Sequence, residues 1–143
     1  MALNKIFTGM EQGPEAIDSN FTQLQDIGNQ WNRATSWKNL DVTGANFENN
    51  TATLPVRIYR YGKVVHLMGS LKHVSKTGDV LTIPVGYRPI HDIHQDLPEQ
   101  SGNIGYSARA YIKNNVLSIV AIDGANPIWI DSITYVTEDD FPS

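Results

Sequence analysis

The spacing of apolar residues changes once along this chain, and that change limits the folds open to it. Up to residue 31, apolar side chains recur every three or four positions, the period of a helix with one buried face. From Trp37 onward they alternate with polar side chains, the period of half-buried β-strands. The sequence therefore predicts one short N-terminal helix and a mainly β remainder, without the alternating strands and helices that build a parallel sheet.

The predicted helix covers roughly residues 14–30 and follows an extended arm, residues 1–13. Pro14 suits the first turn of a helix, and Glu15 is favourable near the positive end of the helix dipole. The helix carries an apolar stripe formed by Ile17, Phe21, Leu24, Ile27 and Trp31. At ~1.5 Å per residue the helix is about 25 Å long and marginally stable alone, so the stripe needs a partner surface.

Two partner surfaces fit this pattern: the β part of the same chain, or copies of the helix in a parallel bundle. The bundle is favoured by a heptad spacing, with Ile17, Leu24 and Trp31 at one seam position and Asn20 and Ile27 at the other. An Asn at a seam position can fix both register and oligomer number. The bundle predicts that residues 1–33 serve attachment and oligomerisation.

Residues 34–143 indicate six to eight short strands with turns every eight to twelve residues, which is typical of an antiparallel β-sandwich or jelly roll. One hairpin is predicted to turn at Tyr61–Gly62. A second is predicted to turn at Asn114–Asn115, because Asn tolerates the positive φ of a type I′ turn. The segment IWIDSITYV is expected to be one final strand. The predicted fold class is thus mainly β, with a helical stalk before a sandwich head.

Composition argues against several classes of function. The net charge is −4 and the 11 Lys and Arg residues are scattered singly, whereas nucleic-acid-binding proteins carry clustered basic residues. Cysteine is absent, which indicates synthesis in a reducing cytoplasm or stability gained by oligomerisation. Neither a signal peptide nor an apolar run of ~20 residues is evident, so we expect a soluble protein with no nucleic-acid and no membrane partner.

Several stretches resemble proteins of tailed phages that infect Gram-positive bacteria. NKIFTGMEQGPEAIDSNFTQL is similar to the N-terminal segment of baseplate receptor-binding and accessory proteins. The matching positions are Lys5, Phe7, Gly9, Met10, Gly13, Glu15 and Ile17. VRIYRYGKVVHLMGSL and LTIPVGYRPI resemble the C-terminal domains of phage tail-fibre and minor structural proteins. The order of these stretches, a docking arm before a fibre-type β domain, also resembles the order in these phage proteins.

The resemblance implies a homotrimer at the tail tip or baseplate of a virion. Three helices form a stalk, and three β heads bind a host cell-surface saccharide or teichoic acid. The arm docks onto other baseplate proteins through Lys5, Phe7 and Met10. The protein is then a non-enzymatic receptor-binding protein without a cofactor. Two alternatives stay open: a structural component of the baseplate or fibre, and a depolymerase that cuts cell-wall polysaccharide.

Four residues near the end of the chain have side chains that stack on sugars or bond to their hydroxyl groups. They are Asp123, Asn126, Trp129 and Asp131. In related lactococcal phage proteins a His-x-Asp and a following Trp form the saccharide site. The resemblance implies these roles for Asp123 and Trp129, with Ala121 at the place of the His. The alternative is that Trp129 belongs to the core and Asp123 forms a turn.

A second candidate surface is a basic and aromatic patch on one strand. Arg109, Tyr111 and Lys113 share a face of that strand. The patch suits a phosphate-bearing polymer, or it is an ordinary solvent face. His66 and His73, on other strands, are expected to be structural or surface residues.

The stretch RPIHDIHQDLPEQ is a third candidate. His91 and Asp92, with His94, belong either to a surface loop that contacts ligand, to a plain solvated loop or to a metal site. On a strand, positions 91 and 94 point to opposite faces, which argues against metal. We therefore predict no metal site.

No motif of a known catalytic class is present. The sequence lacks a Cys nucleophile, Gly-x-Ser-x-Gly, His-Glu-x-x-His and a phosphate-binding glycine loop. A carboxylate pair for glycoside cleavage can be drawn from Asp131, Glu138, Asp139 and Asp140. The simpler interpretation of TEDDFPS is a solvated acidic tail, so no catalytic residue is predicted.

Overall fold

The computed structural model of the protein describes residues 12–100 and 107–142. It divides the chain into two units, Met1–Arg33 and Ala34–Ser143. No helix within the described residues is long and apolar enough to cross a membrane. The functions assigned to the two units, attachment and receptor binding, stay predictions.

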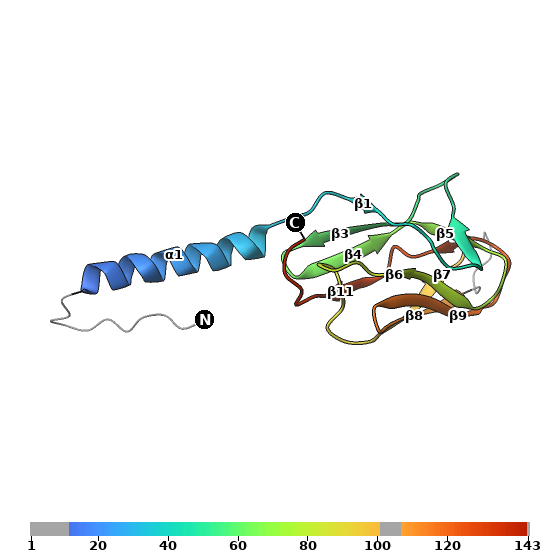
Figure 1. The fold of residues 1–143 in the computed structure, drawn as a ribbon. Helices are drawn as coiled ribbons and strands as arrows, with labels where there is room; N and C mark the ends of the chain where they lie inside the picture. The colour runs from blue at the N-terminus through green and yellow to red at the C-terminus, as the bar shows by residue number, and fades with distance from the viewer. Residues whose placement is uncertain (1–11, 101–106, 143) are drawn as a thin grey trace. The chain divides into compact units, whose positions relative to one another are not determined.

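The first unit contains one helix, α1, which spans Gly13–Asn32 (Figure 1). It begins one residue before and ends two residues after the predicted range, within the usual uncertainty of helix ends. Pro14 and Glu15 lie in its first turn, as predicted. Outside the described residues lie the predicted attachment residues Lys5, Phe7 and Met10.

The apolar stripe of α1 is largely exposed in a single chain. Four of its side chains are between 42% and 64% exposed: Ile17, Phe21, Leu24 and Trp31. Asn20 and Ile27, at the second seam position, are half-buried. Large apolar side chains that share one exposed face are typical of an interaction surface. The stripe is therefore a candidate interaction surface, and a partner made of copies of this chain stays a prediction.

The second unit is built from short antiparallel strands in three sheets (Figure 1). In spatial order, sheet A contains β1 (Lys38–Asn39), β3 (Arg57–Tyr61), β4 (Val64–Met68) and β11 (Thr134–Val136). Sheet B contains β10 (Ile128–Trp129), β5 (Ser70–His73) and β2 (Phe47–Asn49). Sheet C contains β6 (Gly78–Thr82), β9 (Val116–Ile122), β8 (Ser107–Lys113) and β7 (Ile93–Pro98). The predicted fold class, a mainly β antiparallel sandwich after a short helix, is confirmed.

One hydrophobic core joins the three sheets. Its fully buried members include Ile58, Val65 and Leu67 of sheet A, Leu71 and Ile128 of sheet B, and Leu97, Leu117 and Ile119 of sheet C. Burying one such side chain contributes about 1.5–3 kcal/mol. All three sheets therefore bury their apolar faces in the same core.

Both predicted hairpins form, one of them shifted by a residue. Strands β3 and β4 pair as far as Tyr61 and Val64, so the turn is Gly62–Lys63 and the predicted turn at Tyr61–Gly62 is wrong. Glycine suits the first turn position, where φ is 55°. The turn between β8 and β9 is confirmed: Asn114 and Asn115 have φ of 51° and 64°.

Sheets A and B meet at a bend centred on Gly69. This residue alone separates β4 from β5, and its φ of 135° favours glycine. A Cβ added there would lie 2.7 Å from the carbonyl oxygen of Pro55. The segment predicted as one final strand is divided in the same place, into β10 of sheet B and β11 of sheet A. Between them Asp131 Oδ1 accepts a hydrogen bond from Gly69 N at 2.7 Å, so both segments change sheet together.

The polar stretch predicted as a loop contains a strand. Ile93–Pro98 forms β7, which pairs with β8 at the edge of sheet C. Of the inward positions, Leu97 is buried and Ile93 and Gln95 are half-buried. The three polar residues of this strand, His94, Gln95 and Asp96, are consecutive, so its alternation is weak in the sequence. His91 and Asp92 precede β7 and are exposed.

Candidate functional site

The four predicted saccharide residues lie on β10 and the two segments that flank it, with Asp123 and Asn126 before the strand and Asp131 after it. Trp129 pairs with Ser70 of β5. Asn126 lies at the other end of β5, where its backbone oxygen is 3.0 Å from His73 Nε2. Ser70 and His73 are three strand positions apart, about 10 Å. The four residues therefore form a row that runs from Asp123, beside Ser107 of sheet C, along β10 to Asp131, and they do not converge on one point.

Two of these four side chains also bond within the chain. Asp123 Oδ2 accepts a hydrogen bond from Ser107 Oγ at 3.3 Å, and Asp131 Oδ1 binds the backbone at Gly69. Each carboxylate has a second oxygen that these two bonds do not use. Trp129 is half-buried, which differs from the fully buried core position of the alternative interpretation.

Residues far away in the sequence hold this loop in place. Glu99 is only 6% exposed, and its Oε1 accepts a hydrogen bond from Gly124 N at 2.6 Å. The backbone N–H of Gln100 donates to Pro127 O at 2.6 Å. Sequence analysis missed both residues because nothing local links them to a loop about 25 positions later. The loop that carries Asp123 and Asn126 is thus fixed to the head.

The predicted basic patch on β8 contains its own counter-charge. Arg109 Nε lies 2.9 Å from Asp96 Oδ1 of β7, in an ion pair whose side chains are more than half exposed. The ring of Tyr111 lies edge-on to His94, with centroids 4.2 Å apart. Lys113 is exposed. Because Asp96 offsets Arg109, this face attracts an anionic polymer less than the strand sequence alone suggests.

The His91 stretch shows no grouping of metal ligands. Among the described residues, no three His, Cys, Asp or Glu side chains lie close enough together to hold a metal ion. His94 belongs to β7 and contacts Tyr111, whereas His91 and Asp92 lie before the strand. The exposed pair stays a predicted ligand contact.

An aromatic cluster that sequence analysis missed covers the outer face of sheet A. The ring of Trp37 lies 5.1 Å from that of Tyr59 and, edge-on, 6.0 Å from that of His66. His66 Nδ1 is 2.8 Å from Thr134 Oγ1, which fixes the imidazole. Trp37 remains 40% exposed. His66 is thus half-buried and hydrogen-bonded within this cluster, as expected of a structural or surface residue.

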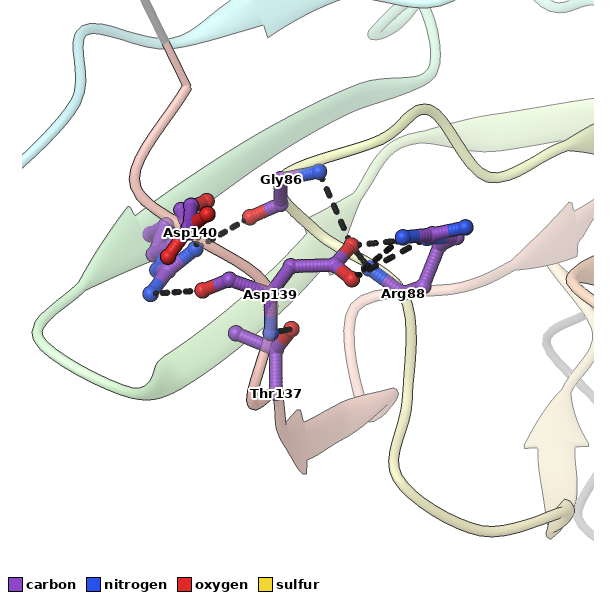
Figure 2. Close-up of polar contacts among 6 residues, drawn as sticks. Gly86, Arg88, Thr137, Asp139 and Asp140 are labelled. Atoms are coloured by element: carbon purple, nitrogen blue, oxygen red, sulfur yellow. Dashed lines mark hydrogen bonds and ion pairs between the residues drawn. The ribbon is translucent and has the colours of Figure 1, made fainter.

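The acidic chain end is not a solvated tail, and that prediction is wrong. Figure 2 shows the Asp139 carboxylate between Arg88 and Gly86. Arg88 Nη2 lies 2.7 Å from Oδ1, and the backbone N–H groups of Gly86 and Arg88 donate to Oδ2 at 2.9 and 3.0 Å. We name Arg60, Gly86, Arg88, Asp139 and Asp140 the C-terminal clasp.

Arg60 connects the clasp to sheet A. It is only 4% exposed, and its guanidinium donates to four backbone carbonyl groups, those of Gly62, Gly86, Asp139 and Asp140. A buried cation is stable only if its donors are satisfied, because it has lost its hydration. The chain end wraps around Arg60 and supplies two of these acceptors.

The clasp explains why Asp139 does not fit the role of a general acid. Its pKa is lowered from 3.8 to about 2, mainly by the hydrogen bond from the Arg88 side chain and further by the backbone N–H groups, against an opposing effect of burial. A general acid in glycoside cleavage needs a raised pKa. Glu138 and Asp140 are exposed. The Asp139 carboxylate thus holds the chain end through Arg88 and Gly86 and does not have the raised pKa of a general acid.

The lowered pKa predicts a stability that depends on acid pH. Asp139 should stabilise the fold fully above about pH 5 and lose this contribution as the pH falls from 4 toward 2, because the unfolded chain binds a proton first. We expect about 1–2 kcal/mol, less than the shift alone implies, since Arg88 is 40% exposed and solvent screens the pair. Urea unfolding of wild type and Asp139→Asn at pH 5 and pH 2.5 measures it.

The control for this prediction is Asp96→Asn. It removes the acidic partner of an ion pair whose side chains are 57% and 67% exposed. The difference in unfolding free energy between wild type and this variant should stay nearly constant over the same pH range. An equal pH dependence for both substitutions would contradict the role of the clasp.

Comparison with known proteins gives a match in structure only. No protein-family model matches the sequence, and no curated protein matches it. The structure is similar to the crystal structure of the receptor binding protein of Listeria phage PSA, with a TM-score of 0.65 and 17% identity over 92% of this chain and 82% of that chain. Residues 34–143 alone are 77% of the chain, so the match extends into the first unit. At this identity the similarity shows a shared fold.

Proposed function

We propose that the chain is a receptor-binding protein of a tailed phage that infects a Gram-positive host. The observation that carries the proposal is the fold shared with a phage receptor binding protein over 92% of the chain. The resemblance of the N-terminal segment to baseplate proteins supports the same conclusion, and the proposed location is the tail tip or baseplate. The proposed ligand is a saccharide or teichoic acid of the host cell wall, and the proposed role is binding without catalysis.

The proposed assembly is a homotrimer joined through α1, with the arm before α1 attached to other baseplate proteins. The exposed stripe supports a multimeric stalk because several copies would cover each other's apolar side chains. Three heads on one stalk compensate for weak single sites. A site with a millimolar dissociation constant contributes only about −4 kcal/mol, and linkage raises the overall affinity by about 10²–10⁴.

The proposed saccharide contacts lie on exposed parts of the head. The row along β10 offers the ring of Trp129 and the polar groups of Asp123, Asn126 and Asp131. Further contacts are proposed for Arg109 and Tyr111 on sheet C, and for His91 and Asp92 before β7. Aromatic rings receive the apolar face of a sugar, and carboxylate and amide groups bond to its hydroxyl groups.

Binding to cell walls tests the proposal. Fluorescently labelled protein should adhere to walls from part of a panel of Gram-positive strains, and chemical removal of the wall glycopolymers should abolish adhesion. Trp129→Ala should weaken adhesion by about tenfold or more, because truncating an aromatic anchor costs more than 1 kcal/mol. Near-UV circular dichroism and the unfolding midpoint of the variant should stay close to wild type.

Other outcomes favour the alternatives. Co-purification with baseplate proteins, without adhesion to any wall, would identify a structural component. Progressive shortening of the extracted polymer would identify a depolymerase. Unfolding of Trp129→Ala would place Trp129 in the core and return the saccharide site to the other candidate surfaces.

A further inference from the structure

Sheet A presents an outer face on which the register brings together cationic, aromatic and polar groups. Asn39, Arg57 and Met68 form one row across β1, β3 and β4. The next row contains Tyr59, His66 and Thr134, with the ring of Trp37 beside Tyr59. The third row contains Tyr61, Val64 and Val136. None of these outward residues carries a carboxylate, in contrast to the outer face of sheet C.

Arg57 stands out among the arginines of the head. Its guanidinium carbon lies 5.0 Å from the centre of the Trp37 ring, and its Nη2 donates to Met68 Sδ at 3.4 Å. Its buried Nε finds no acceptor among the described residues. A thioether is a weak acceptor, and a guanidinium carries five donors suited to planar, anionic oxygen groups.

The other three arginines of the head have their oxygen acceptors within the chain. Arg60 binds backbone carbonyl groups, Arg88 binds Asp139, and Arg109 binds Asp96. Among the arginines of the head, Arg57 thus differs in having no oxygen acceptor within the described residues. The position of the Arg57 cation therefore matches an anionic ligand by charge.

The neighbouring groups indicate that the anion is attached to a sugar. Trp37 is 40% exposed, and Tyr59 and His66 support its ring from the sheet, so it can receive the apolar face of a pyranose. When Nδ1 of His66 accepts the hydroxyl proton of Thr134, the imidazole donates through Nε2, and Asn39 adds an amide. A purely apolar ligand would bury the guanidinium without an acceptor, which is unfavourable.

We propose that Trp37, Arg57, Tyr59 and His66 form a binding site for a phosphate-bearing sugar unit on the outer face of sheet A. The sugar stacks on Trp37, and the phosphate binds Arg57 and His66. This site is separate from the row along β10. The proposal deepens the proposed function, on which it rests for the source of the ligand, because it names the chemical class of wall polymer that this face selects.

The test uses small probes and the full chain. Hexose 1-phosphates, the corresponding methyl hexosides and inorganic phosphate are titrated in the millimolar range, and the indole N–H signal of Trp37 is followed by NMR. The signal is assigned with Trp37→Phe, since the chain has three tryptophans. We expect saturable shifts with at least one hexose 1-phosphate and weaker effects from the methyl hexoside and from phosphate alone.

Two variants separate the charge of Arg57 from charge in general. Arg57→Gln should weaken binding of the hexose phosphate by about tenfold or more, because hydrogen bonds to charged groups are worth ~1.5–3 kcal/mol. Lys38→Gln removes one positive charge from β1 at a position that pairs with Ile58 and not with the outer row. It should bind as wild type does.

Each other result overturns the site. If methyl hexosides bound as well as hexose phosphates, and Arg57→Gln had no effect, the face would bind neutral sugars instead. No shift of the Trp37 signal with any hexose phosphate would exclude the site. A fall in oligomer mass in Trp37→Ala would show that a second copy covers this face. Wall adhesion that survives Arg57→Gln would refute the site on sheet A and leave the proposed function intact. Hexose phosphate binding without wall adhesion would support the site and contradict the proposed function.

Discussion

Replacing Leu24 by Asp should convert an assembled protein into single chains. Leu24 lies in the middle of the exposed stripe of α1 and is 50% exposed in a single chain. In a parallel bundle the three copies of Leu24 meet at the centre, so the substitution would place three carboxylates together in an apolar interface. Burying unpaired charges costs several kcal/mol for each ion, more than a short two-heptad bundle can supply.

Mass in solution measures this effect directly. The wild type should have about three times the chain mass of 15.9 kDa, and Leu24→Asp should have the mass of one chain. The matched control is Gln25→Asp, which introduces the same residue one position later on an exposed face of the helix. It carries the same cost in helix propensity and should remain a trimer. A wild type that runs as a single chain would refute the stalk.

The loss of assembly should also reduce wall adhesion. A single head keeps its sites but loses the linkage between them, so the apparent affinity should fall by about 10²–10⁴. Binding of one hexose phosphate to one head should not change, since that measurement does not depend on linkage. This contrast separates a defect in assembly from a defect in the site.

Much of the fold followed from periodicity in the sequence. The alternation that placed Arg109, Tyr111 and Lys113 on one face of β8 leaves Ala108, Ala110 and Ile112 on the other, and these three are at most 2% exposed. The three- and four-residue spacing before residue 31 predicted α1, and the two asparagines predicted the turn from β8 to β9. These features are local, because a face or a turn is set by residues a few positions apart.

Features that depend on distant residues could not be predicted in this way. The final segment looks like one strand, but Asp131 binds Gly69 and divides it between two sheets. Asp139 and Arg88 are 51 positions apart, and no residue near either of them in the sequence indicates their ion pair. An acidic chain end is therefore read as a tail until the tertiary structure supplies its partners.

The candidate surfaces were likewise predictable only where their residues are close together in the sequence. The row from Asp123 to Asp131 is continuous in sequence and was predicted, although the residues that fix the loop were not. The cluster around Trp37 combines β3, β4 and the segment before β1, and its members are not core residues, so a search for the core does not find them. The alternation of Arg57 and Tyr59 with buried residues of β3 was its only local signal.

The burial of Arg60 is a long-range feature that did leave a signal in the sequence. By the period of β3, Arg60 shares the inward face with Ile58, an unusual place for a cation. The structure resolves this with four carbonyl acceptors and the ring of Phe141, 4.6 Å from the guanidinium. Arg60→Met should remove the donors and leave several carbonyl groups unsatisfied, which predicts a loss of about 3–5 kcal/mol.

Thermal and urea unfolding of the head, by near-UV circular dichroism, check this expectation. A loss of this size lowers the melting temperature by roughly 10–20 °C in a domain of about 110 residues. The same substitution at an exposed ion pair, Arg109→Met, should cost at most about 1 kcal/mol. Deleting residues 138–143 removes the carbonyl acceptors of Asp139 and Asp140 and should destabilise the head similarly. Combining this deletion with Arg60→Met should cost little more than either change alone, because both changes break the same contacts. Full additivity of the two losses would show that the chain end and Arg60 act independently and that the clasp does not close the head.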